Sequence, residues 1–325
     1  MTDNNPIMPG IPPAPTESQF EQIAKAIDPN ARVISTRKMA GGISCRMDVL
    51  ELATGPGAPT PAKTTKVIVR QYYEEELRQE TSQNRLESTT LRILEANNVP
   101  APGVIVGEEI GKILGRPAIV ISYLDGVPGL TPDNPHDWAR QLARAIAQVH
   151  AVEVPEHLAA VLAPVPEQIQ RWLAPSAPPE RFSKHELGPR LWEAMQQLWP
   201  NVDISARNLN HGDFWPGNTV WKDGNLLAIV DWEGPQLGEP TLDIGYFLSD
   251  AAYFGIDIEE IFLAEYEKSS GRPTRDLQFW KMAAAARAMP DVGPWAQGYV
   301  ELGIRKMTAD EIRRTYSNFV KSLLG

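Results

Sequence analysis

The stretch from His211 to Asp243 constrains the fold of this chain more than any other part of it. Turn residues and one apolar run separate five polar residues of the kinds found in functional sites: His211, Asp213, Asn218, Asp231 and Asp243. The apolar run at 226–230, entered by a tight turn, predicts a short buried strand, and residues 219–222 predict its hairpin partner. The hairpin would place Asn218 and Asp231 at neighbouring strand ends. Their side-chain oxygens would then converge on one point, which suits a hard cation.

Length and composition indicate an ordinary globular protein. With 325 residues, 42% hydrophobic and 22% charged, the chain can form two lobes with full cores. The single cysteine, Cys45, argues against a disulfide framework and a cysteine metal site, and fits a reducing compartment. The sequence holds no apolar run of membrane-spanning length, and its first residues lack the basic and apolar regions of a signal peptide. We therefore expect a cytoplasmic protein that does not associate with membranes.

The formal net charge is −10, and most of it lies on residues 151–325. Phosphate backbones are held by Lys and Arg, so this acidic half argues against nucleic acid as a partner. It would suit a cationic substrate, and it equally fits a solvated acidic surface.

The first 124 residues predict a small sheet with one main helix. Residues 1–16 hold five prolines and predict a disordered arm, after which a short helix spans 17–27. Residues 54–66 consist mainly of Pro, Gly, Ala and Thr, and this composition predicts a flexible hairpin loop. The remaining segments alternate as strand, strand, strand, helix, strand, strand, at 32–35, 45–52, 67–70, 84–97, 104–106 and 119–121.

The rest of the chain predicts helices. Residues 135–151 are strongly amphipathic, and His150 at their end is expected to be a capping or core histidine. Short helical pieces are expected over 155–210, and longer helices at 246–253, 257–269, 275–289 and 308–323. The pattern predicts an α+β chain with a small sheet lobe at 17–124, expected to bind a nucleotide, a hinge near 122–126 and a helical C-terminal lobe at 125–325.

Three residues carry the expected chemistry: Asp213, Asn218 and Asp231. Each alone is an ordinary turn or capping residue. Together they match the kinase pattern, in which a loop aspartate takes the substrate hydroxyl, an asparagine in that loop binds one magnesium ion, and a strand-end aspartate bridges magnesium to the phosphates.

At this point the chain resembles the aminoglycoside phosphotransferase-like and choline-kinase-like small-molecule kinases, whose fold is that of the protein kinases. Three blocks carry the resemblance: His211–Asn218, Ile229–Glu233 and Gly238–Asp243. The resemblance implies that Asp213 is the catalytic base and that Asn218 and Asp231 hold Mg²⁺. It also implies that His211 and Asp243 brace the catalytic loop. The short interval between Asp231 and Asp243 leaves no room for a protein kinase activation segment, so the implied acceptor is a small molecule.

The resemblance extends into the N-terminal lobe. By itself, the pair Gly41 and Gly42 could be a simple turn, or a turn that lets backbone amides approach a phosphate. In the family this loop, through Ser44, positions the nucleotide. Arg70 falls where most kinases place the lysine that binds the α- and β-phosphates, and Glu87 would be its partner from the helix. A planar guanidinium is not equivalent to an ammonium point charge, so this position departs from the usual pattern.

The family's hinge would lie at residues 121–124, where the Ser122 carbonyl and the Leu124 amide would hold the adenine edge of ATP. The expected function is therefore ATP- and Mg²⁺-dependent phosphoryl transfer to a small-molecule hydroxyl. A catalytically silent nucleotide-binding pseudokinase and a metal-dependent phosphohydrolase are the alternatives.

Aminoglycosides, macrolides, choline, homoserine, hydroxyacyl thioesters and sugars are acceptors in relatives of this fold, which does not choose among them. An aromatic box for a quaternary ammonium group is conceivable, and core packing is the other use of the tryptophans of the second lobe: Trp172, Trp192, Trp199, Trp280 and Trp295.

Overall fold

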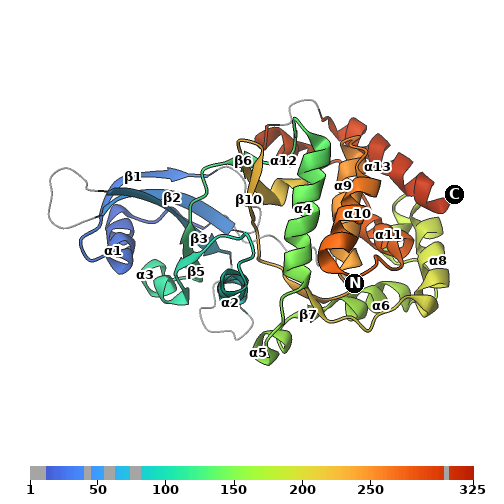
Figure 1. Ribbon diagram of the computed structural model, residues 1–325, viewed down its shortest axis with the longest axis horizontal. Coiled ribbons are helices and arrows are strands. Elements are labelled where there is room, and N and C mark those ends of the chain that lie inside the picture. Colours follow the sequence, from blue (N-terminus) through green and yellow to red (C-terminus); the bar gives the residue numbers. More distant parts are fainter. Residues whose placement is uncertain (1–11, 40–44, 55–62, 74–81, 304–306) are drawn as a thin grey trace. The chain divides into compact units, whose positions relative to one another are not determined.

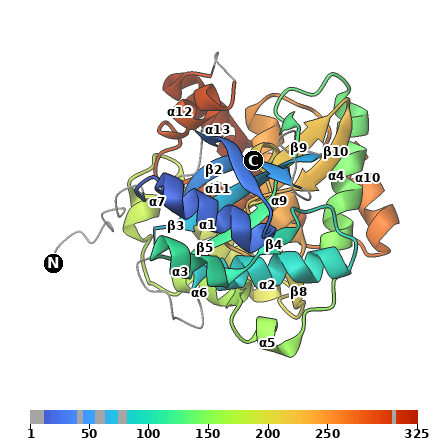
Figure 2. The same cartoon turned by 90° about the vertical axis from the view of Figure 1, so that its left-hand side faces the viewer.

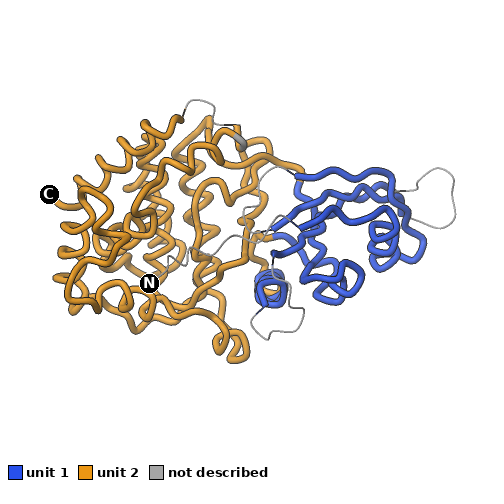
Figure 3. Tube along the Cα trace, turned by 180° about the vertical axis from the view of Figure 1, so that it is seen from behind, with its two compact units in different colours: residues 1–95, 102–124 blue, residues 96–101, 125–325 orange. Residues whose placement is uncertain are grey.

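The computed structural model describes residues 12–39, 45–54, 63–73, 82–303 and 307–325. The chain forms two compact units (Figure 3). Unit 1 comprises Met1–Glu95 and Pro102–Leu124, and unit 2 comprises Ala96–Ala101 and Asp125–Gly325. Residues 96–101, expected in the first lobe, thus belong to unit 2. Most of the expected disordered arm, residues 1–11, lies outside the described residues, while Pro12 and Pro15 are buried.

Unit 1 is built on a five-stranded antiparallel sheet in the order β1-β2-β3-β5-β4. All five strands correspond to predicted ones: β1 (Arg32–Lys38), β2 (Cys45–Thr54), β3 (Lys63–Tyr72), β4 (Val104–Val106) and β5 (Ala118–Ser122). The predicted loop at 54–66 is wrong at both ends. Thr54 still pairs with Lys63, because β2 and β3 continue their ladder beyond the apolar residues that signalled them. Residues 55–62 lie outside the described residues.

The two faces of this sheet carry different layers. One face packs on α1 (Glu17–Ile27), with Leu50, Val67 and Val120 in a shared core. Helix α1 begins as expected, since Thr16 and Gln19 form a capping box. Figure 2 shows α1 beside α3 (Gly111–Leu114), which follows the short 3-10 helix η1 (Glu108–Ile110); the sequence pattern did not predict these two helices. The other face carries Arg70, which contacts α2 (Gln83–Ala96) through Glu87.

Unit 2 is mostly helical. Its longer helices pack in contacting pairs, α4 with α10 and α11 with α9 (Figure 1). These helices are α4 (Pro135–His150), α9 (Thr241–Tyr253), α10 (Glu259–Ser270), α11 (Leu277–Ala288) and α13 (Ala309–Leu324). Between and after them lie α5 (Glu156–Ala159), α6 (Val165–Leu173), α7 (Glu180–Ser183), α8 (Gly188–Leu198), the 3-10 helix η2 (Trp199–Asn201) and α12 (Trp295–Glu301). None of the described helices combines the length and the apolar character needed to cross a membrane.

Two small sheets in unit 2 hold the segment from His211 to Asp243. The predicted hairpin is confirmed: β9 (Thr219–Lys222) pairs antiparallel with β10 (Asn225–Ile229), and β6 (Val127–Pro128) joins β9. The second sheet has the order β7-β11-β8, with β7 (Ala163–Pro164), β11 (Gln236–Gly238) and β8 (Asn208–Asn210). Helix α9 starts earlier than expected, so Asp243 lies in its first turn.

Candidate active site

The loop between β8 and β9 is held in one conformation by a glycine and a buried aromatic ring. Gly212 has φ +78°, and a Cβ atom there would collide with the carbonyl oxygen of Gly234. Phe214 is fully buried, with its ring centroid 5.5 Å from that of Phe247 on α9. The loop ends in a short 3-10 helix, η3 (Pro216–Asn218), which leads into β9. Asp213, between Gly212 and Phe214, is therefore fixed on both sides.

Asp243 binds the backbone of this loop from α9. Its buried carboxylate accepts hydrogen bonds from the backbone amides of His211, at 2.7 Å, and Gly212, at 3.0 Å. The Nε2 atom of buried His150 lies 3.2 Å from the same carboxylate, and its Nδ1 atom lies 2.9 Å from the Tyr266 hydroxyl. The end of α4 and the start of α9 thus hold the loop together.

His211 uses both ring nitrogens in fixed contacts. Nδ1 accepts a hydrogen bond from the Asp213 amide at 3.2 Å, so the proton is on Nε2, which donates to the Val230 carbonyl at 2.9 Å. The ring also packs against Trp232 at a centroid distance of 4.4 Å. With both ring nitrogens in these contacts, His211 ties the loop to the end of β10.

Asp213 is the accessible acid of the loop. Its side chain is 42% exposed, enough for a small molecule to reach it. Oδ1 pairs with Arg287 Nη1 at 2.8 Å, and Oδ2 accepts a hydrogen bond from Asn218 Nδ2 at 3.1 Å. Arg287, from α11, also donates to the Gly212 carbonyl at 3.0 Å. Burial acts to lower the pKa of the Arg287 guanidinium, but Asp213, Tyr246 and Asp250 together outweigh it and raise that pKa overall.

The two predicted metal ligands, Asn218 and Asp231, lie next to each other at the end of the hairpin formed by β9 and β10. The Val230 amide donates to the Asn218 carbonyl at 2.8 Å, which places Asp231 directly beside Asn218 along the hairpin. The Asn218 side chain bonds Asp213 through Nδ2, so its Oδ1 atom is not used in those bonds. In the part of the chain that the structure describes, His, Cys, Asp and Glu form no group of three able to hold a metal. One carboxylate and one amide oxygen fit Mg²⁺, which takes its other ligands from phosphates and water.

In unit 1, Arg70 and Glu87 form a buried ion pair, with Arg70 Nε 3.1 Å from Glu87 Oε2. The Tyr72 hydroxyl donates to the same Glu87 oxygen. Burial, and then the charge of Glu87, raise the pKa of Tyr72 well above its ordinary value, so the hydroxyl remains a donor.

The remaining predicted nucleotide contacts are spread over unit 1. The Ser122 side chain accepts a hydrogen bond from the Gly103 amide at 3.0 Å, and Leu124 is the last residue of the unit. Gly41, Gly42 and Ser44 lie outside the described residues.

Sequence reasoning missed three residues of these clusters: Arg287, His150 as the partner of Asp243, and Tyr72. Arg287 stands in an alanine-rich helix without a motif, and it meets Asp213 only because α11 packs on α9. His150 was expected to be buried, and it is, but nothing near it in the sequence signals Asp243. Tyr72 lies two residues after Arg70 on the same strand face, so alternation along β3 is the signal that could have found it.

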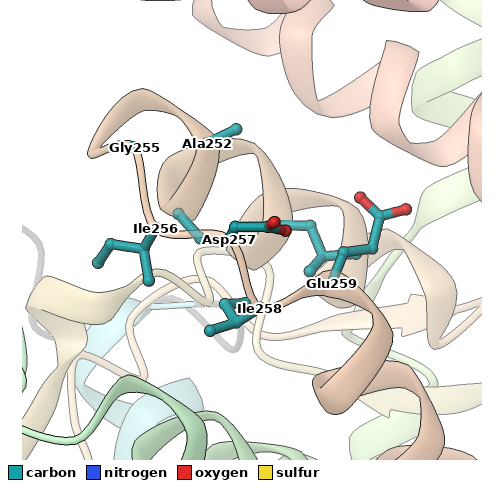
Figure 4. A pocket seen from close by; sticks show the side chains of 8 residues that line it. Ala252, Gly255, Ile256, Asp257, Ile258 and Glu259 are labelled. Carbon is teal, nitrogen blue, oxygen red and sulfur yellow. The ribbon is translucent and has the colours of Figure 1, made fainter.

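A shallow hollow lies where α9 turns into α10, lined by residues including Ala252, Ile256 and Ile258 (Figure 4). None of the predicted site residues lines this hollow. It is therefore separate from the Asp213 cluster.

Comparison with known proteins gives one family and several structural neighbours. The family model described as "Phosphotransferase enzyme family" matches residues 60–282. Acyl-CoA dehydrogenase family member 10 of Mus musculus is 24% identical over 226 residues, which are 64% of this chain and 20% of that protein. The chain thus spans about a fifth of the length of this curated relative.

Two solved structures share the fold over nearly the whole chain. Spectinomycin phosphotransferase in complex with ADP and spectinomycin has a TM-score of 0.62 and 12% identity, covering 95% of this chain and 97% of that one. Choline kinase from Cryptosporidium parvum Iowa II has a TM-score of 0.58 and 12% identity, covering 94% and 95%. At this identity the likeness shows the kinase-like fold, in agreement with the predicted α+β class.

Proposed function

The chain belongs to the phosphotransferase enzyme family. From that premise we propose that it is an ATP-dependent kinase that transfers the γ-phosphoryl group to a hydroxyl of a small molecule. One observation carries the proposal: the accessible Asp213 carboxylate is held by Arg287 and Asn218 on a loop anchored from α9. A carboxylate fixed in this way can orient a hydroxyl before transfer.

In the proposed reaction the acceptor hydroxyl donates a hydrogen bond to Asp213. The hydroxyl oxygen attacks the γ-phosphorus, a new P–O bond forms, and the bond from that phosphorus to the bridging oxygen of ADP breaks. The hydroxyl proton passes to Asp213 and then to water, and ADP leaves. An aspartate carboxylate is a weak base for an alcohol, so Asp213 acts as much by alignment as by proton transfer.

Asn218 Oδ1 and the Asp231 carboxylate are the proposed ligands of Mg²⁺, which when bound would neutralise phosphate charge. Support comes from the oxygen donors of both side chains and from the backbone bond between Asn218 and Val230. The Arg70–Glu87 pair keeps a cation on the sheet of unit 1 for the phosphates. With it, the proposed nucleotide contacts are Gly41, Gly42, Ser44, Ser122 and Leu124.

The test is a coupled ADP-release assay over a panel of alcohols, with the variant Asp213→Asn and the matched control Asp223→Asn. Asp223 is exposed in the turn between β9 and β10 at φ +51°, a backbone conformation that Asn adopts readily, so the control should keep wild-type turnover. Loss of the base should lower kcat by about 100-fold or more while MgATP still binds. Wild-type turnover in Asp213→Asn would show that this carboxylate is not the base.

Magnesium dependence separates a kinase from a catalytically silent nucleotide-binding protein. ATP binding measured by calorimetry should weaken on addition of EDTA, and it should weaken in the same way in an Asp231→Asn variant. If ATP binds equally well without magnesium, and no alcohol in the panel releases ADP, the pseudokinase alternative replaces this proposal.

A further inference from the structure

Two arginines stand on one side of the catalytic loop. Arg287 of α11 pairs with Asp213, and Arg181 of α7 donates through Nη2 to the backbone carbonyl of Arg287 at 2.9 Å. Burial, and also the nearby charge of Arg287, lower the pKa of Arg181. Two neighbouring guanidinium groups are unexpected here, because this half of the chain carries most of the net negative charge.

The two arginines differ in their charge partners. Arg287 has Asp213, whereas among the described residues no carboxylate lies within ion-pair distance of Arg181. The Nε atom of Arg181 is buried and has no hydrogen-bond partner there. A buried guanidinium nitrogen without an acceptor is costly, and the described part of the fold supplies none to this atom. Arg181 is only partly buried as a whole, so a ligand can reach it.

Two aromatic faces beside this site are covered by these arginines. The Arg287 guanidinium lies 4.8 Å from the centroid of the Tyr246 ring, and the Arg181 guanidinium lies 4.6 Å from that of Trp172. An acceptor with an ammonium group would need such faces and would meet like charges on them. This arrangement disfavours the ammonium box that the tryptophan content made conceivable.

A second acid near Arg287, Asp250, does not add a full negative charge at neutral pH. Asp250 of α9 is influenced by both Asp213 and Arg287, and burial together with the charge of Asp213 raises its pKa to about 8. It is therefore mostly protonated at neutral pH. Asp213 then offsets the charge of Arg287, while no described carboxylate pairs with Arg181.

We infer that the acceptor carries an anionic group, a carboxylate or a phosphate monoester, that binds Arg181 while its hydroxyl lies at Asp213. This inference rests on the proposed function and names its substrate class. Arg287 links Arg181 to Asp213, because its backbone carbonyl accepts a hydrogen bond from Arg181 and its guanidinium pairs with Asp213. The anion and the reacting hydroxyl are thus separated by roughly the length of an arginine side chain, and Arg181 is a specificity residue.

The experiment compares acceptors matched in carbon number: hydroxy carboxylates, phosphate monoesters of diols, and amino alcohols. ADP release is measured with MgATP for the wild type, Arg181→Gln, Arg181→Lys and the control Arg190→Gln, which alters an exposed arginine of α8. For the wild type, kcat/KM should be at least about tenfold higher with an anionic set than with the amino alcohols. The better of the two anionic sets identifies the group.

Arg181→Gln should raise the KM of the anionic acceptor about 10- to 100-fold, with kcat and the KM of ATP changed only a few-fold. Arg181→Lys should restore part of the affinity, and Arg190→Gln should behave as wild type. Faster turnover of amino alcohols, or an unchanged KM in Arg181→Gln, would overturn the inference while leaving the kinase proposal intact.

A binding measurement separates the two proposals if no acceptor is phosphorylated. The same carboxylates and phosphate monoesters, without nucleotide, should raise the Tm of the wild type but not of Arg181→Gln. That result with no transfer would remove the kinase function and keep the anion site. Absence of both transfer and stabilisation would overturn the anion site as well.

Discussion

At the residue scale, Asp250 carries an electrostatic cost near the candidate site. The carboxyl group is partly buried on α9, and its pKa is raised to about 8 by burial first and by Asp213 second, with Arg287 opposing. In the unfolded chain this group would ionise near 3.8. The folded protein thus keeps a proton that the unfolded chain has lost.

This difference in bound protons predicts that Asp250→Asn increases the stability of the folded protein, by an amount that depends on pH. The contribution of Asp250 to stability is fully present below about pH 4 and is lost as the pH rises towards 8, because only the folded state still binds the proton. Asparagine does not ionise, so at about pH 9 the variant should be more stable by on the order of 2 kcal/mol, a value reduced for partial solvent contact.

Urea melts of wild type and Asp250→Asn at about pH 5 and pH 9 would measure the effect. The stability difference between the two proteins should be larger at the higher pH than at the lower one, where only part of the contribution of Asp250 has been lost. A constant difference at both pH values would show that Asp250 does not titrate as described.

The site residues that sequence could predict are those carried by one continuous motif. Asp213 and Asn218 lie five positions apart in the sequence, and their side chains are hydrogen-bonded to each other in the structure. Arg287 and His150 could not be found in this way, because they reach the loop from helices distant in the sequence. Contacts of that kind depend on helix packing, which a single sequence does not display.

At the element scale, the crossing of α9 and α11 brings Arg287 to the loop. The helices approach closely at Gly245, where a Cβ atom would lie 2.7 Å from the backbone carbonyl oxygen of Trp280. Trp280 is fully buried, so the backbone of α11 has little freedom to move away.

Gly245→Ala should therefore lower the free energy of unfolding by about 1–3 kcal/mol, through overpacking at this crossing. It should also reduce kcat, since a shift of α11 moves Arg287 relative to Asp213. Thermal unfolding and the ADP-release assay measure the two effects.

Gly298→Ala is the matched control. Gly298 lies in α12, and a Cβ atom there would have no neighbour within 4 Å. Helix propensity alone predicts that this change stabilises by about 0.5–1 kcal/mol and leaves activity unchanged. Equal effects of the two substitutions would rule out close packing at Gly245.

Elements with a clear period were predicted, and short ones were not. The hairpin of β9 and β10 and the amphipathic α4 follow from alternation and helical spacing. Strands β7 and β11, of two and three residues, are too short to show a period. Helix α9 begins five residues before its predicted start. The residues just after Pro240 have the composition of a turn, so the sequence does not indicate that the helix begins there.

At the scale of the whole molecule, each unit has its own hydrophobic core. The core of unit 1 includes Leu50 and Val67, and that of unit 2 includes Leu191 and Trp280. All nine tryptophans fall within unit 2. Tryptophan fluorescence therefore reports on unit 2 alone, while far-ultraviolet circular dichroism reports on both units.

Leu50→Ala should destabilise unit 1 by about 2–5 kcal/mol, since Leu50 is fully buried. The unfolding of unit 1, seen by circular dichroism, should move to lower urea concentration. The midpoint seen by fluorescence, which reports on unit 2, should not differ measurably from that of the wild type. Leu191→Ala, an equally buried residue of unit 2, should instead move the fluorescence midpoint. A fluorescence shift in Leu50→Ala would show that the units unfold together.

The segment 96–101 leaves unit 1 after α2 and joins unit 2, where the Pro100 carbonyl accepts a hydrogen bond from the Ile229 amide at 2.9 Å. Ile229 belongs to β10, an outer strand of its sheet. On the ribosome, every residue of unit 1 has been synthesised by Leu124, long before Ile229 emerges. Unit 1 can thus fold early, whereas Pro100 must await its partner, so this anchorage is among the later steps of co-translational folding.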